Sequence, residues 1–156
     1  MKEIIEKLTE LNKTISTMES CTGGAVASEI TNYEGSSEVL KFSAVTYSNE
    51  FKIKMGVEKD IIDKFTVYSG ETAVAMATKI AEFSNSDFGI GITGKLNRID
   101  KNNLYGENNV VFISIYDRFN KKYYNSEIKV LKTTRKENKV IVIEKIIGEL
   151  KSILNI

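Results

Sequence analysis

Two short segments carry the residue types that a serine-based hydrolysis needs. The first is Glu19-Ser20-Cys21-Thr22-Gly23-Gly24, at the junction of a predicted strand and a predicted helix. The first N–H groups of a helix have no partner inside it, so at this junction they can hold an oxyanion or a phosphate beside Ser20. The two glycines let a ligand approach the backbone. The same residues also suit a serine N-cap followed by glycines for close packing, so both interpretations stay open.

The second segment is Tyr47-Ser48-Asn49-Glu50-Phe51-Lys52, just after the next predicted strand. The chain has no His, which excludes a Ser-His-Asp triad, a Cys-His pair and a His-ligated metal unless a partner supplies the imidazole. A serine nucleophile then needs another base, and a lysine made neutral by burial is the usual substitute. Lys52 could be that base, with Tyr47 relaying a proton or holding the lysine. Since most lysines are solvated, a surface position for Lys52 is the alternative.

A third segment, Gly89-Ile90-Gly91-Ile92-Thr93-Gly94, matches the glycine pattern of dinucleotide-binding folds. That pattern must open a helix, with an acidic residue about 20 positions on. Here a polar segment without helical periodicity follows, over residues 94–109. We therefore interpret Gly89 and Gly91 as strand glycines that pack against a neighbouring element, and expect Thr93 and Gly94 to line a pocket at the end of the strand.

The amino-acid composition limits the kinds of partner that the chain can bind. The chain has 156 residues with 22 Lys+Arg against 21 Asp+Glu, a net charge of +1, which argues against binding nucleic acid through a general basic field. Its single cysteine, Cys21, can form neither an internal disulfide nor a metal-binding cluster, which agrees with a reducing compartment. No apolar run approaches the ~20 residues that span a bilayer, and the first residues are charged. We expect a cytoplasmic protein that binds no membrane, nucleic acid or metal.

The periodicity of apolar residues predicts alternating helices and strands. Strands are predicted over 14–18, 43–48, 87–93 and 110–116, with an edge strand over 123–131. Helices are predicted over 2–12, 25–31, 61–65 and 71–83, the last capped by Ser69. A further amphipathic helix over 134–154 has a predicted buried stripe of Val140, Ile143, Ile146, Ile147, Leu150 and Ile153. The alternation predicts one layered α/β domain over residues 1–156.

Taken in order, these segments resemble the CinA C-terminal domain family, whose members include nicotinamide mononucleotide amidohydrolases. The resemblance covers nearly the whole chain and rests on an ordered pair of motifs, E-S-C-T-G-G and Y-S-N-E-x-K. The matching residues are Glu19 to Gly24, Tyr47 to Glu50 with Lys52, Ser69, Glu71 to Ala73, Met76, Thr93, Gly94 and Arg135.

The resemblance implies a three-layer α/β/α fold and hydrolysis of the carboxamide of nicotinamide mononucleotide to nicotinic acid mononucleotide and ammonia, without metal or cofactor. It implies Ser20 as the nucleophile, with Lys52 and Tyr47 beside it for proton transfer. Oxyanion stabilisation or substrate binding is expected of Cys21, Thr22, Gly23, Gly24, Ser48, Thr93, Gly94 and Arg135. The implied partner is a small nucleotide substrate, and we expect a homo-oligomer.

One segment departs from the family. After the Thr-Gly pair, members usually continue with A-G-P and a glycine-rich loop, whereas this chain continues Lys95-Leu96-Asn97-Arg98 and contains no proline. Lys95 and Arg98 could bind a phosphate group or could be solvated loop charges. The departure leaves a second hypothesis open: a paralogue without turnover that binds a nucleotide or serves a regulatory or interaction role. A dinucleotide-dependent oxidoreductase is a more distant third.

Overall fold

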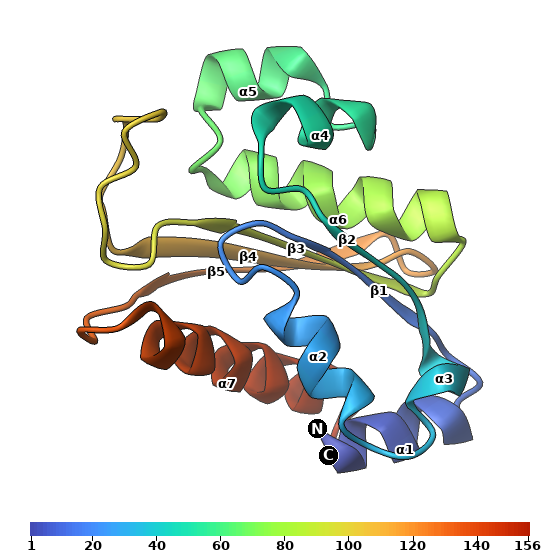
Figure 1. The fold of residues 1–156 in the computed structure, drawn as a ribbon. Coiled ribbons are helices and arrows are strands. Elements are labelled where there is room, and N and C mark those ends of the chain that lie inside the picture. Colours follow the sequence, from blue (N-terminus) through green and yellow to red (C-terminus); the bar gives the residue numbers. More distant parts are fainter.

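The computed structural model describes all residues 1–156, and its centre is a five-stranded sheet between two layers of helices (Figure 1). The strand order is β2-β1-β3-β4-β5. Strands β2 (Leu40–Val45), β1 (Ile15–Glu19) and β3 (Phe88–Gly94) are parallel, whereas β4 (Val110–Asp117) and β5 (Lys122–Lys129) continue the sheet antiparallel. The predicted three-layer α/β/α architecture is confirmed.

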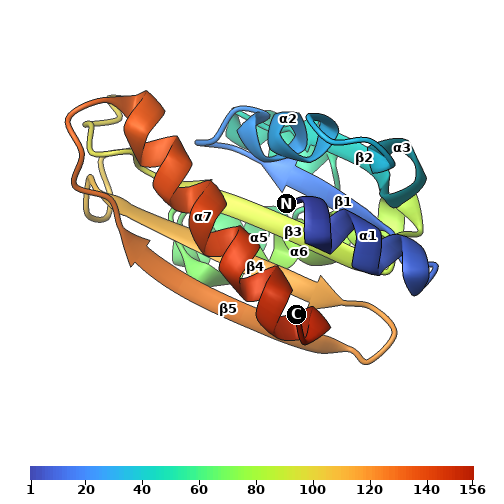
Figure 2. The ribbon, with the colours of Figure 1, turned by 90° about the horizontal axis from the view of Figure 1, so that it is seen from below.

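Four helices cover one face of the sheet: α1 (Lys2–Glu10), α2 (Ala25–Thr31), α3 (Ser36–Val39) and α7 (Arg135–Leu154) (Figures 1 and 2). The other face carries α4 (Asn49–Lys54), α5 (Lys59–Phe65) and α6 (Gly70–Ser84). The larger apolar core joins α1, α2 and α7 to the sheet, and a smaller cluster around Met18, Met76 and Ile80 lies under α6. None of the helices combines the length and the apolar composition that crossing a membrane requires.

The glycines of β3 have the packing role that the sequence predicts. A Cβ on Gly89 would lie 2.0 Å from the Ala77 carbonyl oxygen, and one on Gly91 would lie 2.2 Å from that of Ala73. The backbone of α6 therefore rests directly on β3, which is possible because both glycines lack a side chain. Beyond Gly94 the chain enters a loop over residues 95–109 rather than a helix, so this segment lacks the context of a dinucleotide-binding turn.

The structure corrects three details of the sequence prediction. Strand β2 begins at Leu40, earlier than predicted, because the short helix α3 leads directly into it. The segment Asn49–Lys54 forms helix α4, which is not among the helices predicted from the sequence. On α7, Val140 is exposed and the buried positions are Asn138, Val142, Ile146, Leu150 and Leu154. The other five predicted residues are buried or packed against the core, and Asn138 also points inward because its side chain hydrogen-bonds to the backbone of Lys132 and Leu96.

The order of the parallel strands brings three loops to one edge of the sheet. Glu19 of β1 is in register with Val45 of β2 and with Ile92 of β3, so the carboxyl ends of the three strands are level. From β1 the chain turns to β2 along one face, and from β2 it crosses the other face to β3. A crevice forms at such a reversal of strand order and is the usual ligand site of open α/β sheets.

Candidate active site

Ser20 is the first residue after β1. It lies at the carboxyl ends of the parallel strands, where the connections between strands switch from one face of the sheet to the other. Its backbone N–H donates to the Ile92 carbonyl at 3.0 Å, so the residue is held between the ends of β1 and β3. Its side chain is nearly buried. A hydroxyl held on a fixed backbone in this way suits a nucleophile.

Lys52 is the group that can activate Ser20. Its Nζ lies 3.1 Å from Ser20 Oγ and 2.8 Å from the Thr46 carbonyl oxygen, and the residue is only 2% exposed. Burial lowers the pKa of Lys52 from 10.5 to about 8, and the nearby Asp100 charge opposes this fall. A neutral amine can donate to the Thr46 carbonyl and accept the Ser20 hydroxyl proton on its lone pair. The dry environment that the sequence hypothesis requires is therefore present.

Lys52 reaches this position because a short helix turns it inward. Ser48 caps α4, its hydroxyl accepting from the Phe51 N–H at 3.3 Å. Lys52 is the only buried residue of α4, whereas Lys54 on the same helix is exposed and pairs with Glu50. Ser48 thus has a capping role in the structure and also lines the cavity described below.

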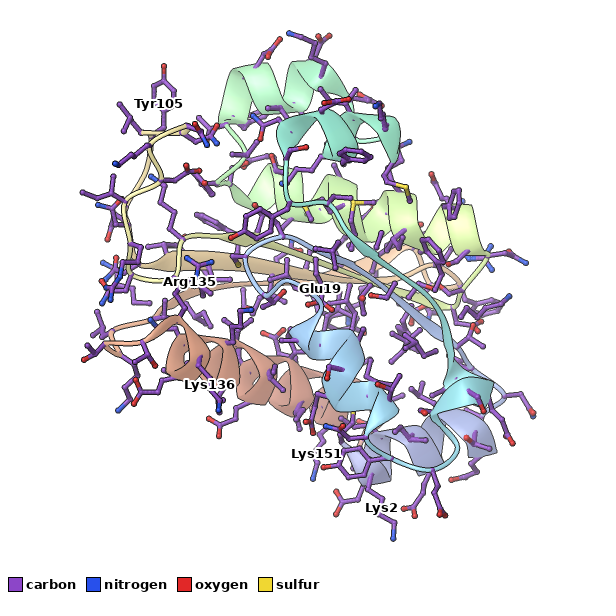
Figure 3. All side chains as sticks on the ribbon, viewed as in Figure 1. Lys2, Glu19, Tyr105, Arg135, Lys136 and Lys151 are labelled. Atoms are coloured by element: carbon purple, nitrogen blue, oxygen red, sulfur yellow. The ribbon has the colours of Figure 1, made fainter.

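The amides at the start of α2 are occupied by the protein itself. Glu19, with no exposed surface, accepts hydrogen bonds from the N–H groups of Gly24 (3.0 Å), Val26 (3.2 Å) and Ala27 (2.9 Å). Figure 3 shows Glu19 at the point where β1 passes into α2. The expectation that these helical N–H groups stay free for an oxyanion or a phosphate is therefore wrong, because an internal carboxylate takes the place of the anion.

Two backbone amides beside the nucleophile are left without a partner. The Gly23 N–H donates to the Ser20 carbonyl, but the N–H groups of Cys21 and Thr22 donate to no other residue. Gly23 and Gly24 have φ values of 62° and 89°, so the tight turn itself requires glycine at both positions. The turn leaves both amides without a protein acceptor, and Cys21, which lines the cavity described below, can offer its amide to an oxyanion.

Cys21 does not compete with Ser20 as a nucleophile. The thiol is buried, and burial raises its pKa to about 12, with the charges of Arg135 and Lys52 opposing the rise. The thiolate is the reactive form of cysteine, and at neutral pH this thiol stays protonated. The hydroxyl next to Lys52 is therefore the better candidate.

A cavity of about 610 Å³ opens onto Ser20 and Lys52. The turn after β1, the segment from β2 into α4, and the loop after β3 form its walls. Figure 1 shows this loop standing up from the sheet on the side of α4 and α5. The lining includes Ser20, Cys21, Tyr47, Ser48, Lys52, Tyr68, Gly94, Lys95, Arg98, Asp100, Asn103 and Arg135.

Of the eleven site residues that the resemblance implies, seven line the cavity and four do not; Lys95 and Arg98 also line it. Ser20, Cys21, Tyr47, Ser48, Lys52, Gly94 and Arg135 line it; Thr22, Gly23, Gly24 and Thr93 do not. Thr93 is buried and its hydroxyl donates to the Val67 carbonyl at 2.6 Å, which ties β3 to the segment before α6. Its side chain is therefore committed to a structural contact.

Tyr47 and Arg135 lie together at the cavity mouth. Tyr47 is 64% exposed, and its hydroxyl accepts a hydrogen bond from Arg135 Nη2 at 3.1 Å. Tyr47 forms no hydrogen bond with Ser20 or Lys52. The structure therefore joins Tyr47 to the start of α7 rather than to the Ser20–Lys52 pair.

The sequence did not single out the residues that anchor the loop over 95–109. The Tyr68 hydroxyl donates to the Asp100 carboxylate, which also accepts from Asn103 Nδ2 at 3.0 Å, and Asn103 accepts from Asn49 of α4 at 3.4 Å. Burial alone would raise the pKa of Asp100, but these hydrogen bonds lower it. Burial and the bond to Asp100 raise the pKa of Tyr68. The contacts join positions far apart in the chain, so no local signal marks them.

Comparison with known proteins agrees with this arrangement. The family model described as "CinA C-terminal domain" matches residues 1–140. The chain belongs to the CinA C-terminal domain family. A "competence-damage inducible protein" of Clostridium kluyveri is 49% identical over 96 residues, which are 60% of this chain and 23% of that protein. A "CinA-like protein" of Kosmotoga olearia is 47% identical over 92 residues, 58% of this chain and 22% of that protein. The matches thus span about a quarter of the length of these CinA relatives.

Solved structures share the CinA fold over nearly the whole chain. The competence/damage inducible protein CihA of Agrobacterium tumefaciens is 29% identical, with a TM-score of 0.86 over 99% of this chain and 92% of that one. A CinA superfamily protein of Klebsiella pneumoniae has a TM-score of 0.88 at 17% identity, covering 99% of this chain and 94% of that one, and supports the fold alone.

Proposed function

We propose that this CinA-family domain is a metal-independent amidohydrolase that cleaves the carboxamide of nicotinamide mononucleotide, giving nicotinic acid mononucleotide and ammonia. The observation that carries the proposal is the buried contact of 3.1 Å between Lys52 Nζ and Ser20 Oγ at the cavity. A structural role gives little reason to bury a lysine without an ion pair, because burying a charge is costly. As a base, the same lysine is useful because burial favours its neutral form.

In the proposed reaction, neutral Lys52 takes the Ser20 proton as Oγ attacks the carboxamide carbon. The carbonyl oxygen becomes an oxyanion, which the free N–H group of Cys21 stabilises; one such donor is commonly worth about 3–4 kcal/mol of barrier. Protonated Lys52 then gives its proton to the departing nitrogen, which leaves as ammonia, and an acyl ester on Ser20 is left. Water, deprotonated by Lys52, hydrolyses this ester to the acid product and restores the Ser20 hydroxyl.

The proposal is tested by measuring ammonia release from nicotinamide mononucleotide, with mass spectrometry of the product. We expect Ser20→Ala and Lys52→Met to lower kcat by at least about 1000-fold, since the nucleophile and its base act as a unit. Ser37→Ala and Lys54→Met are matched controls, because Ser37 lies exposed on α3 and Lys54 lies exposed on the same helix as Lys52. No ammonia from the wild-type protein at high concentration, or full turnover by Ser20→Ala, would contradict the proposal.

A further inference from the structure

The cavity contains a second buried lysine for which the proposed reaction has no use. Lys95, the first residue after β3, lines the cavity and is 4% exposed. It takes part in none of the protein's ion pairs. Its Nζ lies 4.8 Å from the centre of the Tyr68 ring and donates one long hydrogen bond, 3.4 Å to Asn108 Oδ1. A buried ammonium with spare donors and no ion pair is costly, so its place in a cavity points to an anionic ligand.

The other cations of the cavity are either exposed or already in contact with Ser20. Arg98 donates from its two terminal nitrogens to the carbonyls of Asn97 and Thr133, both at 2.8 Å, which fastens the loop to the segment before α7. Arg135 is exposed and donates to Tyr47 at the mouth. Lys52 contacts Ser20. Of the lysines and arginines that line the cavity, only Lys52 and Lys95 are buried. Because Lys52 is hydrogen-bonded to Ser20, Lys95 is the buried cation that can donate to a ligand.

The start of α2, a usual place for phosphate in an α/β fold, is not available either. Glu19 occupies its amides, so an anionic group that enters the cavity has to be bound elsewhere. Asp100 forms no ion pair with Lys95. The charge of Lys95 helps to lower the pKa of Asp100, but the Asp100 carboxylate is hydrogen-bonded to Tyr68, Asn103 and the Asn102 N–H.

We propose that Lys95 binds the phosphate monoester of the substrate, with the Tyr68 ring supporting the lysine, and that it makes the enzyme prefer a nucleotide to the corresponding nucleoside. Lys95 follows β3 and Ser20 follows β1, and the two strands are hydrogen-bonded neighbours, so both side chains belong to one cavity of about 610 Å³. A substrate with an amide at one end and a phosphate at the other can contact both. This inference rests on the proposed function for the identity of the amide only.

The test compares kcat/KM for nicotinamide mononucleotide and nicotinamide riboside, which differ by the phosphate. A charge-assisted bond to phosphate predicts that Lys95→Met lowers kcat/KM for the mononucleotide about 10–100-fold and leaves that for the riboside unchanged. Lys95→Arg, which keeps the cation, should retain the preference for the mononucleotide. Lys101→Met is the matched control, because it removes the same charge from an exposed position of the same loop. An equal loss with both substrates, or the same loss in Lys101→Met, would overturn the assignment.

A binding measurement separates this inference from the proposed function. If the wild-type protein hydrolyses neither compound, the proposed function fails, and calorimetric titration with ribose 5-phosphate and with ribose decides about Lys95. We expect ribose 5-phosphate to bind and ribose not to, with Kd for ribose 5-phosphate raised at least about 10-fold by Lys95→Met and unchanged by Lys101→Met. Absence of binding, or equal affinity of the wild type and Lys95→Met, rejects the subsite.

Discussion

Replacing Lys52 with methionine should make the protein more stable at neutral pH while removing its activity. Burial lowers the pKa of Lys52 from 10.5 to about 8, and each pKa unit corresponds to about 1.4 kcal/mol between protonation states. Charged Lys52 therefore costs the folded state about 3 kcal/mol at pH 7. Methionine has a similar length and no charge, but it cannot donate to the Thr46 carbonyl, a loss of about 1 kcal/mol. The net expectation at pH 7 is a gain of about 2 kcal/mol in the free energy of unfolding.

The dependence on pH is the sharper part of this prediction. Between pH 8 and 10.5 the unfolded chain still binds the Lys52 proton and the folded chain does not, so the wild type gains stability as the pH rises. Above pH 10.5 the penalty is absent and only the lost hydrogen bond separates the two proteins. Lys52→Met should therefore be more stable than the wild type at pH 7, about equal near pH 10, and less stable by about 1 kcal/mol at pH 11.

Urea unfolding of both proteins at several pH values measures this difference, with Lys54→Met as the control on the same helix. At pH 7 the gain should also raise Tm by about 4–8 °C for a domain of this size. Lys54 is exposed and paired with Glu50, so its replacement should change stability by less than about 1 kcal/mol. If the stability difference between Lys52→Met and the wild type stays constant from pH 7 to 11, the conclusion that protonated Lys52 destabilises the folded protein is refuted.

Three further predictions concern the site and its supports. The logarithm of kcat/KM should rise with unit slope up to about pH 8 and then level off, because Lys52 acts in its neutral form; a profile flat from pH 6 to 9 would argue against that base. Glu19→Gln should lower the free energy of unfolding by about 2–3 kcal/mol in urea titrations and reduce kcat, since an amide oxygen cannot accept from all three N–H groups at the start of α2; the control Glu29→Gln, within α2 itself, should do neither. Gly91→Ala should destabilise the domain by about 3 kcal/mol or more in the same assay, because its Cβ would meet the α6 backbone at Ala73; wild-type stability would contradict that packing.

The sequence predicts the frame of this protein well because periodicity and glycine placement are local signals. The strand before Ser20, the helix after Gly24 and the capped helix α6 all follow from the spacing of apolar residues. The absence of histidine also directs attention to Lys52, and the structure places this lysine against Ser20. These inferences succeed because each depends on residue type and on short stretches of chain.

The missed features depend on contacts between distant segments. Asp100 meets Tyr68 across 32 positions, and the loop that carries Asp100 has no periodicity from which a position could be inferred. The burial of Asn138 was missed for a similar reason: its side chain bonds to the Leu96 carbonyl, 42 positions away, so a polar residue shares the buried side of α7 with the predicted apolar stripe. Only the folded chain shows that such polar groups have buried partners.

The two charged residues Glu19 and Lys95 are best understood together. A glutamate directly before a nucleophile would ordinarily oppose the build-up of negative charge on a substrate. Here its carboxylate accepts hydrogen bonds from three amides at the start of α2. These bonds fix the turn after Ser20, and they also occupy the amides that could otherwise bind an external anion. An anionic substrate must then find its positive partner on the loop after β3, and that loop supplies a buried ammonium at its first position. Variation in this loop can therefore change which anion is recognised without disturbing the Ser20–Lys52 pair, because the loop follows β3 whereas Ser20 follows β1 and Lys52 lies in α4.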